Sequence, residues 1–137
     1  MPDTLVPRIL IVDDEEAVLT TYRVILEGAG YEPTGAETCG AALELLRNND
    51  FDLLLCDLSL DGGNSGLDVI SAAVRKRHDI PTILMTGYAD TELPPDLADA
   101  RVTIMLKPIS VSYLLGRIES LLGRTTGDIS GDQNAAD

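Results

Sequence analysis

Acidic, hydroxyl and basic residues recur along this chain, each placed directly after a short apolar run. They are the pair Asp13-Asp14, the single Asp57, the hydroxyl residue Thr86 and the ammonium of Lys107. Carboxylates held close together raise one another's pKa and oppose folding unless a cation neutralises them. Mg²⁺ suits that role because it prefers oxygen ligands and binds through carboxylates together with phosphate oxygens. With a lysine as a point-charge ligand for phosphate, these residue types would support phosphoryl transfer to a carboxylate.

The apolar runs predict the strands that must position these residues. The run that ends at Asp57 is followed by turn-forming residues, which is typical of a strand buried on both faces of a parallel sheet. Apolar residues at helical spacing occur between this strand and the others. The expected strands are 8–12, 31–36, 51–57, 81–85 and 102–106, and the expected helices lie around 18–26, 38–48, 67–74 and 110–122, with a short fifth helix at or after Pro94-Pro95.

Alternating strands and helices indicate an α/β fold, specifically a single-domain, doubly wound, flavodoxin-like parallel sheet of five strands with helices on both faces. The run 31–36 is polar and carries Pro33, which favours a sheet edge, so we expect the strand order 2-1-3-4-5. Ligands of such sheets bind beyond the carboxyl ends of the strands, where the order reverses. Asp13-Asp14 and Asp57 would face each other there. The long stem of Lys107 would cross the end of one intervening strand to reach them.

The composition is that of one globular domain, with 45% hydrophobic and 24% charged residues among 137. A formal net charge of −13 repels a phosphate backbone, so we expect no direct binding to nucleic acid. No apolar stretch reaches the length of a membrane span, and the first residues lack the features of a secretory signal. The two cysteines fit a reducing, cytoplasmic location. We expect an extension over 1–7, one domain over 8–123 and a disordered tail or linker over 124–137.

These motifs resemble those of the receiver domain of two-component response regulators, over residues 8 to 122. The matching residues are Asp13-Asp14 after the first strand, Asp57 after the third, Thr86-Gly87 after the fourth and Lys107-Pro108 after the fifth. Each motif alone is a weak signal. Together, in this order and each at the end of a strand, they are highly specific.

The resemblance implies that Asp57 is a phosphoacceptor. It would take a phosphoryl group from a phosphohistidine of a sensor histidine kinase or a phosphotransfer protein and form an aspartyl phosphate. Such a domain is a regulatory switch rather than an enzyme that acts on other substrates. Lys107 would pair with the phosphoryl oxygens, Thr86 would hydrogen-bond to one of them, and the Lys107-Pro108 peptide bond would be cis.

The resemblance also implies a Mg²⁺ site. Asp14, Asp57 and the backbone carbonyl of Ser59 would ligate the cation directly, whereas Asp13 would act through water. A downstream protein partner would bind the face formed by the short helix after the prolines, the strand 102–106 and the last helix.

Two departures from the family pattern stand out. Asp61 replaces the usual proline after the phosphoacceptor, and the following loop, with Gly62 and Gly63, is expected to be mobile. Ile104 occupies the position where many receivers carry a Tyr or Phe that moves inward with the threonine. Tyr88, the nearest aromatic residue, is a candidate to contribute to the switch or to shield the site.

Other interpretations remain open from the sequence. A phosphohydrolase of the haloacid dehalogenase kind also uses an Asp, Mg²⁺ and a Lys, although its Asp-x-Asp-x-Thr signature is missing at residues 13–17. A receiver-shaped protein-binding module would work without phosphorylation. Taken singly, Asp14 fits a helix cap, Lys107 a surface charge and Cys56 a small core residue. His78 is expected to be solvated, which leaves no phosphodonor histidine in this chain.

Overall fold

A computed structural model describes residues 6–60 and 65–123 of the chain, and five parallel strands form a single sheet within them. The strand order is β2-β1-β3-β4-β5, which confirms the order expected from the sequence. The polar strand β2 lies at one edge and β5 at the other. The strands are β1 (Arg8–Val12), β2 (Glu32–Ala36), β3 (Leu53–Asp57), β4 (Thr82–Thr86) and β5 (Val102–Leu106).

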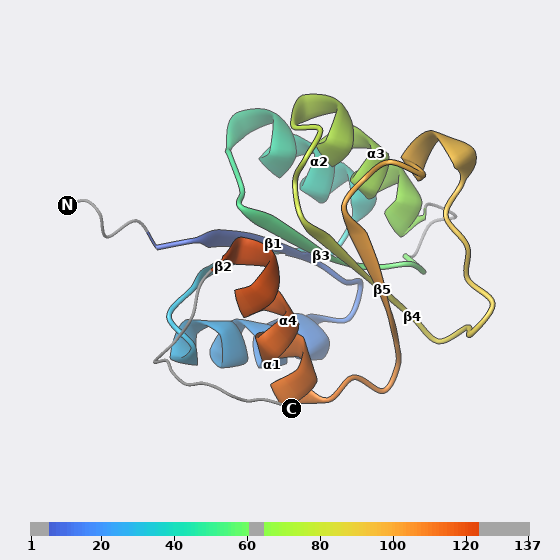
Figure 1. The fold of residues 1–137 in the computed structure, drawn as a ribbon. Coiled ribbons are helices and arrows are strands. Elements are labelled where there is room, and N and C mark those ends of the chain that lie inside the picture. The colour runs from blue at the N-terminus through green and yellow to red at the C-terminus, as the bar shows by residue number, and fades with distance from the viewer. Residues whose placement is uncertain (1–5, 61–64, 124–137) are drawn as a thin grey trace.

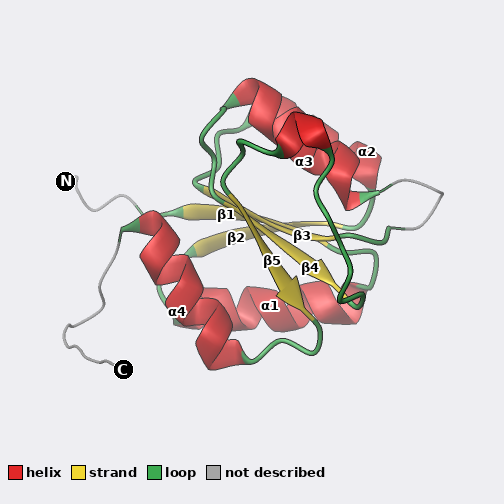
Figure 2. Cartoon of the chain, turned by 45° about the vertical axis from the view of Figure 1, so that its right-hand side comes forward, coloured by secondary structure: helices red, strands yellow, loops and turns green. Residues whose placement is uncertain are grey.

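Helices cover both faces of the sheet (Figure 1). The helices α2 (Cys39–Asn48) and α3 (Gly66–Lys76) pack on one face, and α1 (Glu16–Gly28) and α4 (Val111–Leu122) pack on the other. The view in Figure 2 shows the two layers on either side of the strands. Helices on both faces bury the inner strands β1, β3 and β4 on each side, which explains why these strands are mostly apolar in sequence.

Side chains of successive strand residues point to opposite faces, and each face has its own core. In β1, Ile9 and Ile11 join the cluster under α1 and α4, whereas Leu10 and Val12 join the cluster under α2 and α3. Every residue of β3 is buried, including Asp57. Burying a Leu or Ile side chain stabilises the fold by roughly 1.5–3 kcal/mol, so these two layers fix where the strand ends lie.

The connection between β4 and β5 departs from the regular alternation. The short helix expected at or after the prolines is a 3-10 turn, Pro95–Leu97, rather than an α-helix. Pro94 and Pro95 lack backbone N–H groups, which limits helical hydrogen bonding, and Leu97 anchors the turn by burying its side chain in the core. Since no longer helix covers this edge, Ile104 and Leu106 of β5 are 39% and 50% exposed.

Some expectations from the sequence concern residues that are not described. The first five residues of the expected extension, the mobile loop proposed at 61–64 and the expected tail at 124–137 lie outside the described ranges. Within the described ranges, no helix is both long and apolar enough to cross a membrane. Cys39 and Cys56 are free and buried, and His78 is exposed.

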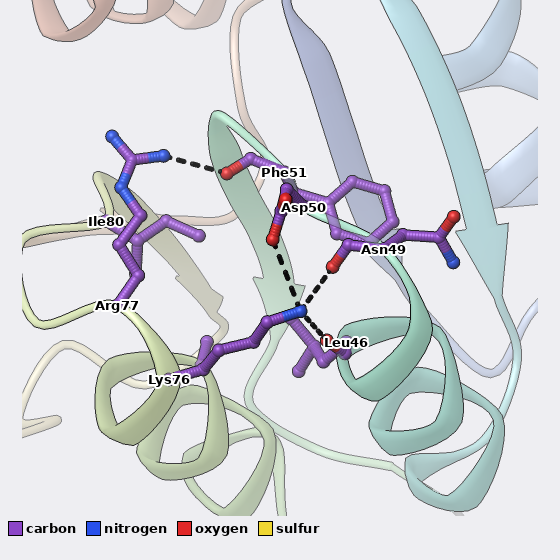
Figure 3. A pocket seen from close by; sticks show the side chains of 8 residues that line it. Leu46, Asn49, Asp50, Phe51, Lys76, Arg77 and Ile80 are labelled. Atoms are coloured by element: carbon purple, nitrogen blue, oxygen red, sulfur yellow. Dashed lines mark hydrogen bonds and ion pairs between the residues drawn. The ribbon is translucent and has the colours of Figure 1, made fainter.

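Lys76 joins α3 to the carboxyl end of α2 near the start of β3, at the opposite end of that strand from Asp57. Lys76, at the end of α3, donates hydrogen bonds to the backbone carbonyls of Leu46 and Asn49 at the end of α2, the latter at 2.7 Å (Figure 3). Its ammonium also lies 3.4 Å from the carboxylate of Asp50. A lysine placed on the last carbonyls of a helix complements the helix dipole. These contacts tie the two helices of this layer together.

Replacing Lys76 by methionine should destabilise the fold by about 1–2 kcal/mol, because carbonyl groups of α2 lose their hydrogen-bond donor while the aliphatic stem is kept. Urea denaturation followed by circular dichroism measures the free energy of unfolding. Arg75→Met, which removes a charge from an exposed position on the same helix, is the matched control and should change that energy by less than about 0.5 kcal/mol. Equal losses in the two variants would contradict the assignment.

Candidate functional site

Asp57 and Lys107 form an ion pair at the carboxyl end of the sheet. The Lys107 Nζ lies 3.1 Å from Asp57 Oδ2 and donates a hydrogen bond to it. Asp57 ends the buried strand β3, and Lys107 directly follows β5, two strands away. The backbone N–H of Lys107 donates to the carbonyl of Thr86 at 2.7 Å, which continues the pairing of β5 with β4 and fixes where the lysine stem begins. The Lys107-Pro108 peptide bond is cis, as the resemblance implies.

Asp13 and Asp14 lie beside this pair. Carboxylate oxygens of Asp13, Asp14 and Asp57 lie within 4.8 Å of one another. Asp13 follows β1, is 2% exposed and accepts a hydrogen bond from the backbone N–H of Glu15 at 2.9 Å. Glu15, not Asp14, is the residue that precedes α1, and it makes no side-chain cap. The helix-cap interpretation of Asp14 is therefore wrong.

The charges at this end of the sheet do not balance. Among the described residues, the three carboxylates of this cluster face one ammonium, that of Lys107. Burial raises the pKa of Asp13, and the charge of Asp57 adds to the increase, while the hydrogen bond from Glu15 and the charge of Lys107 oppose it. Burial lowers the pKa of Lys107, but its hydrogen bond to Asp57 and the charge of that carboxylate outweigh the effect and raise it. The cluster suits a divalent cation, whose oxygen ligands are already gathered.

The loop after β3 passes close to the phosphoacceptor candidate. The backbone N–H of Ser59 lies 3.5 Å from Asp57 Oδ1, so Ser59 is next to the acidic cluster. Gly66, at the start of α3, approaches the backbone of Asp57 so closely that a Cβ at this position would lie 2.1 Å from the Asp57 carbonyl oxygen. Only glycine fits there without a shift of backbone. The Cys56 thiol lies within hydrogen-bonding distance of the carbonyls of Asp57 and Gly66, and burial raises its pKa, which fits a core residue.

Thr86 lies at the end of β4, and its hydroxyl forms hydrogen bonds within the turn that follows this strand. Thr86 is 1% exposed, and its Oγ1 accepts a hydrogen bond from the backbone N–H of Tyr88 at 3.0 Å. The same oxygen lies 2.9 Å from Oγ1 of Thr91. Among the described residues, no hydrogen bond joins the Thr86 hydroxyl to the side chain of Asp57 or Lys107. The Tyr88 side chain is 65% exposed.

Two residues near the site were not found from the sequence. Tyr22 of α1 lines a pocket together with Asp13 and Lys107. Burial raises the pKa of its hydroxyl, while the charge of Lys107 opposes that increase. The apolar spacing of α1 indicated only that Tyr22 faces the core. Thr91 stands in an irregular stretch with no periodicity, so no sequence signal marked it.

This chain belongs to the response regulator receiver domain family. The model of the family, described as "Response regulator receiver domain", matches residues 9–119. Receiver domains are regulatory phosphoacceptor domains of two-component systems. The match agrees with the doubly wound fold and with the acidic cluster, and it leaves no reason to treat the chain as a phosphohydrolase of the haloacid dehalogenase kind.

Similar proteins include complete regulators and isolated receivers. The alginate biosynthesis transcriptional regulatory protein AlgB of Pseudomonas aeruginosa is 35% identical over 108 residues, which are 78% of this chain and 24% of AlgB. This chain thus spans about a quarter of that regulator's length. A CheY-like receiver domain protein from Methanospirillum hungatei has a TM-score of 0.76 and 35% identity, covering 87% of this chain and 95% of that one.

A third similar structure contains Mg²⁺ and BeF. The response regulator TrrA of Thermotoga maritima, in complex with Mg²⁺ and BeF, has a TM-score of 0.73 and 30% identity, and the match covers 85% of this chain and 99% of that one.

Replacing Asp13 by asparagine should raise the free energy of unfolding by roughly 1 kcal/mol when divalent cations are removed by chelation. The amide keeps an acceptor for the Glu15 N–H but carries no charge. Because the pKa of Asp13 is raised on folding, the wild type loses stability as the pH rises from the ordinary carboxyl value through the raised one. Urea denaturation at several pH values measures the effect, and Asp99→Asn, at an exposed position, is the control. A destabilised Asp13→Asn variant would contradict this account.

Proposed function

We propose that this chain is a phosphoacceptor switch of a two-component or phosphorelay system, in which Asp57 accepts a phosphoryl group from a phosphohistidine. The observation that carries the proposal is the arrangement of Asp57 at the end of a buried strand, with Lys107 at 3.1 Å and the carboxylates of Asp13 and Asp14 beside it. Family membership supports the same conclusion.

In the proposed reaction, a carboxylate oxygen of Asp57 attacks the phosphorus of the donor. The bond between phosphorus and the histidine nitrogen breaks, and the ring, protonated on its other nitrogen, leaves as neutral imidazole. The product is an acyl phosphate on Asp57. Lys107, which pairs with Asp57 before the reaction, would transfer its hydrogen bond to a phosphoryl oxygen. Thr86 would donate its hydroxyl proton to another phosphoryl oxygen.

Mg²⁺ would be held by Asp14, Asp57 and the backbone carbonyl of Ser59, with Asp13 acting through water. The gathered carboxylate oxygens of the three aspartates support this assignment. When bound, the cation offsets the negative charge that would otherwise repel an incoming phosphoryl group. Asp57 then supplies the nucleophile, and Lys107 supplies the remaining positive charge.

The phosphodonor would dock beside the site on α1. Val18, Tyr22 and Ile109 line an apolar groove between α1 and the segment that leads into α4, and the same three residues line the pocket that reaches Lys107. A groove of this kind accepts the apolar face of a partner helix. A histidine on such a helix would then be presented to Asp57.

The downstream partner would bind the face formed by the 3-10 turn Pro95–Leu97, β5 and α4. Ile104 and Leu106 of β5, with Val111 and Tyr113 of α4, are 39% to 59% exposed. These apolar residues also favour a second candidate function, a binding module that works without phosphorylation. In that case the partner's affinity would be the same with and without a phosphoryl group. AlgB is a transcriptional regulatory protein of which this chain spans 24%, and its role in transcription is not proposed for this chain.

Incubation with acetyl phosphate and Mg²⁺ should add the mass of one phosphoryl group to the wild type and none to Asp57→Asn. The amide keeps the shape of the side chain but cannot act as a nucleophile. Intact-mass spectrometry measures the adduct. The matched control is Asp52→Asn, a carboxyl on the amino-terminal side of the same strand, which should still be modified. An unmodified wild type, or a modified Asp57→Asn variant, would overturn the proposal.

Mg²⁺ should stabilise the wild type, because a ligand that binds only the folded state adds about 2.7 kcal/mol at one hundred times its Kd. Asp14→Asn should lose most of this gain, since it removes a proposed direct ligand. Thermal unfolding across a titration of MgCl2 measures the effect. Glu16→Gln, two residues further along and exposed, should keep it. If the two variants respond to Mg²⁺ alike, the assigned site is wrong.

A further inference from the structure

The hydroxyl of Thr86 is held by a small network of hydrogen bonds in the turn after β4. Its members are Thr86, Tyr88 and Thr91. Tyr88 N–H donates to Thr86 Oγ1 at 3.0 Å, and Thr91 Oγ1 lies 2.9 Å from Thr86 Oγ1. Thr91 Oγ1 also lies 2.8 Å from the backbone carbonyl of Tyr88, and the Thr91 N–H reaches that carbonyl at 3.2 Å. The turn is therefore closed by side chains as well as by backbone.

The donors in this network follow from the number of protons available. A threonine hydroxyl has one proton to donate and two lone pairs. A carbonyl oxygen only accepts, so the Thr91 hydroxyl proton is directed to Tyr88. The contact between the two hydroxyls must then use the proton of Thr86, with Thr91 Oγ1 as its acceptor. Thr86 has no second hydroxyl proton to offer.

The Thr91 hydroxyl and a phosphoryl group on Asp57 would therefore compete for the single hydroxyl proton of Thr86. Under the proposed function, Thr86 donates its only hydroxyl proton to a phosphoryl oxygen on Asp57. It can do so only after its hydrogen bond to Thr91 has broken. We propose that Thr91 is a positioning residue that holds the Thr86 hydroxyl in the unphosphorylated state and releases it when the phosphoryl group takes over as acceptor.

Release of Thr91 would also alter the segment that precedes the edge strand. Thr91 lies just before Pro94-Pro95, and Leu97 anchors the following 3-10 turn in the core. The segment 87–93 thus runs from the end of β4 to a fixed point. It contacts the Thr86 hydroxyl through the backbone N–H of Tyr88 and through the side chain of Thr91. Release of Thr91 would thereby couple the site to the partly exposed edge strand β5, where Ile104 replaces the family's aromatic residue. This inference rests on the proposed function, because it depends on the phosphorylation of Asp57.

The test compares Thr91→Val with Thr91→Ser by titrating Mg²⁺ and beryllofluoride, a phosphoryl mimic, into the full chain. Valine keeps the shape of threonine but cannot accept the Thr86 proton, so the Thr91→Val variant should bind the mimic about fivefold more tightly. Serine keeps the hydroxyl and should restore the wild-type affinity. The amide resonance of Tyr88, followed by ¹H–¹⁵N NMR, reports binding and the state of the turn together.

A double-mutant comparison separates this role from a general effect on the loop. In a Thr86→Ala background the proton in question is absent, so Thr91→Val should no longer change the affinity. Unchanged or weaker binding by Thr91→Val, or the same gain in the Thr86→Ala background, would overturn the inference while leaving the phosphoacceptor proposal intact. A wild type that binds no beryllofluoride would overturn both, because the inference depends on a phosphoryl group at Asp57.

Discussion

The ion pair between Asp57 and Lys107 is the interaction on which the functional end of the molecule depends. Asp57 sits at the end of a strand buried on both faces, where an isolated charge would be costly. Lys107 comes from the segment after β5 and crosses the end of β4 to reach it. The backbone contact between Lys107 and Thr86 sets the starting point of that stem. This ion pair thus connects the central strand β3 to the edge strand β5 across the end of β4.

The same end of the sheet carries more negative charge than Lys107 can offset. Asp13 and Asp14 follow β1, the strand next to β3, so the sheet itself forces the three carboxylates together. Burial makes the crowding worse and raises the pKa of Asp13. Functional sites commonly retain such unfavourable arrangements because binding of the ligand relieves them. Here the excess negative charge would oppose the entry of a phosphoryl group, so phosphorylation would depend on a bound cation.

The connection from β4 to β5 gives this domain its individual character. Two prolines and a 3-10 turn replace a regular helix, so one edge of the sheet stays partly uncovered. The same connection brings Thr91 back onto Thr86. The edge surface and the threonine at the site are consequently linked through the segment 87–101. Near the amino end of β3, Lys76 ties α2 to α3 through hydrogen bonds to backbone carbonyls.

Much of the fold and most of the site followed from the sequence, because both depend on local pattern and topology. Apolar runs marked the strands, the polar strand with Pro33 marked an edge, and the reversal of strand order placed Asp13, Asp14 and Asp57 together. The reach of Lys107 followed from strand spacing alone. These inferences needed no knowledge of individual rotamers, since the sheet fixes the position of each strand end.

Other features were decided only by the tertiary structure. The contact between Thr91 and Thr86 could not be predicted from the sequence, because a hydrogen bond between side chains in an irregular turn has no periodic signature. Tyr22 lies beside Lys107 only because α1 packs against the segment that leads into α4. Likewise, Asp14 was compatible with a helix cap until the structure placed Glu15 in that position. Pattern determines which strands and helices form, whereas packing determines which side chains meet between them.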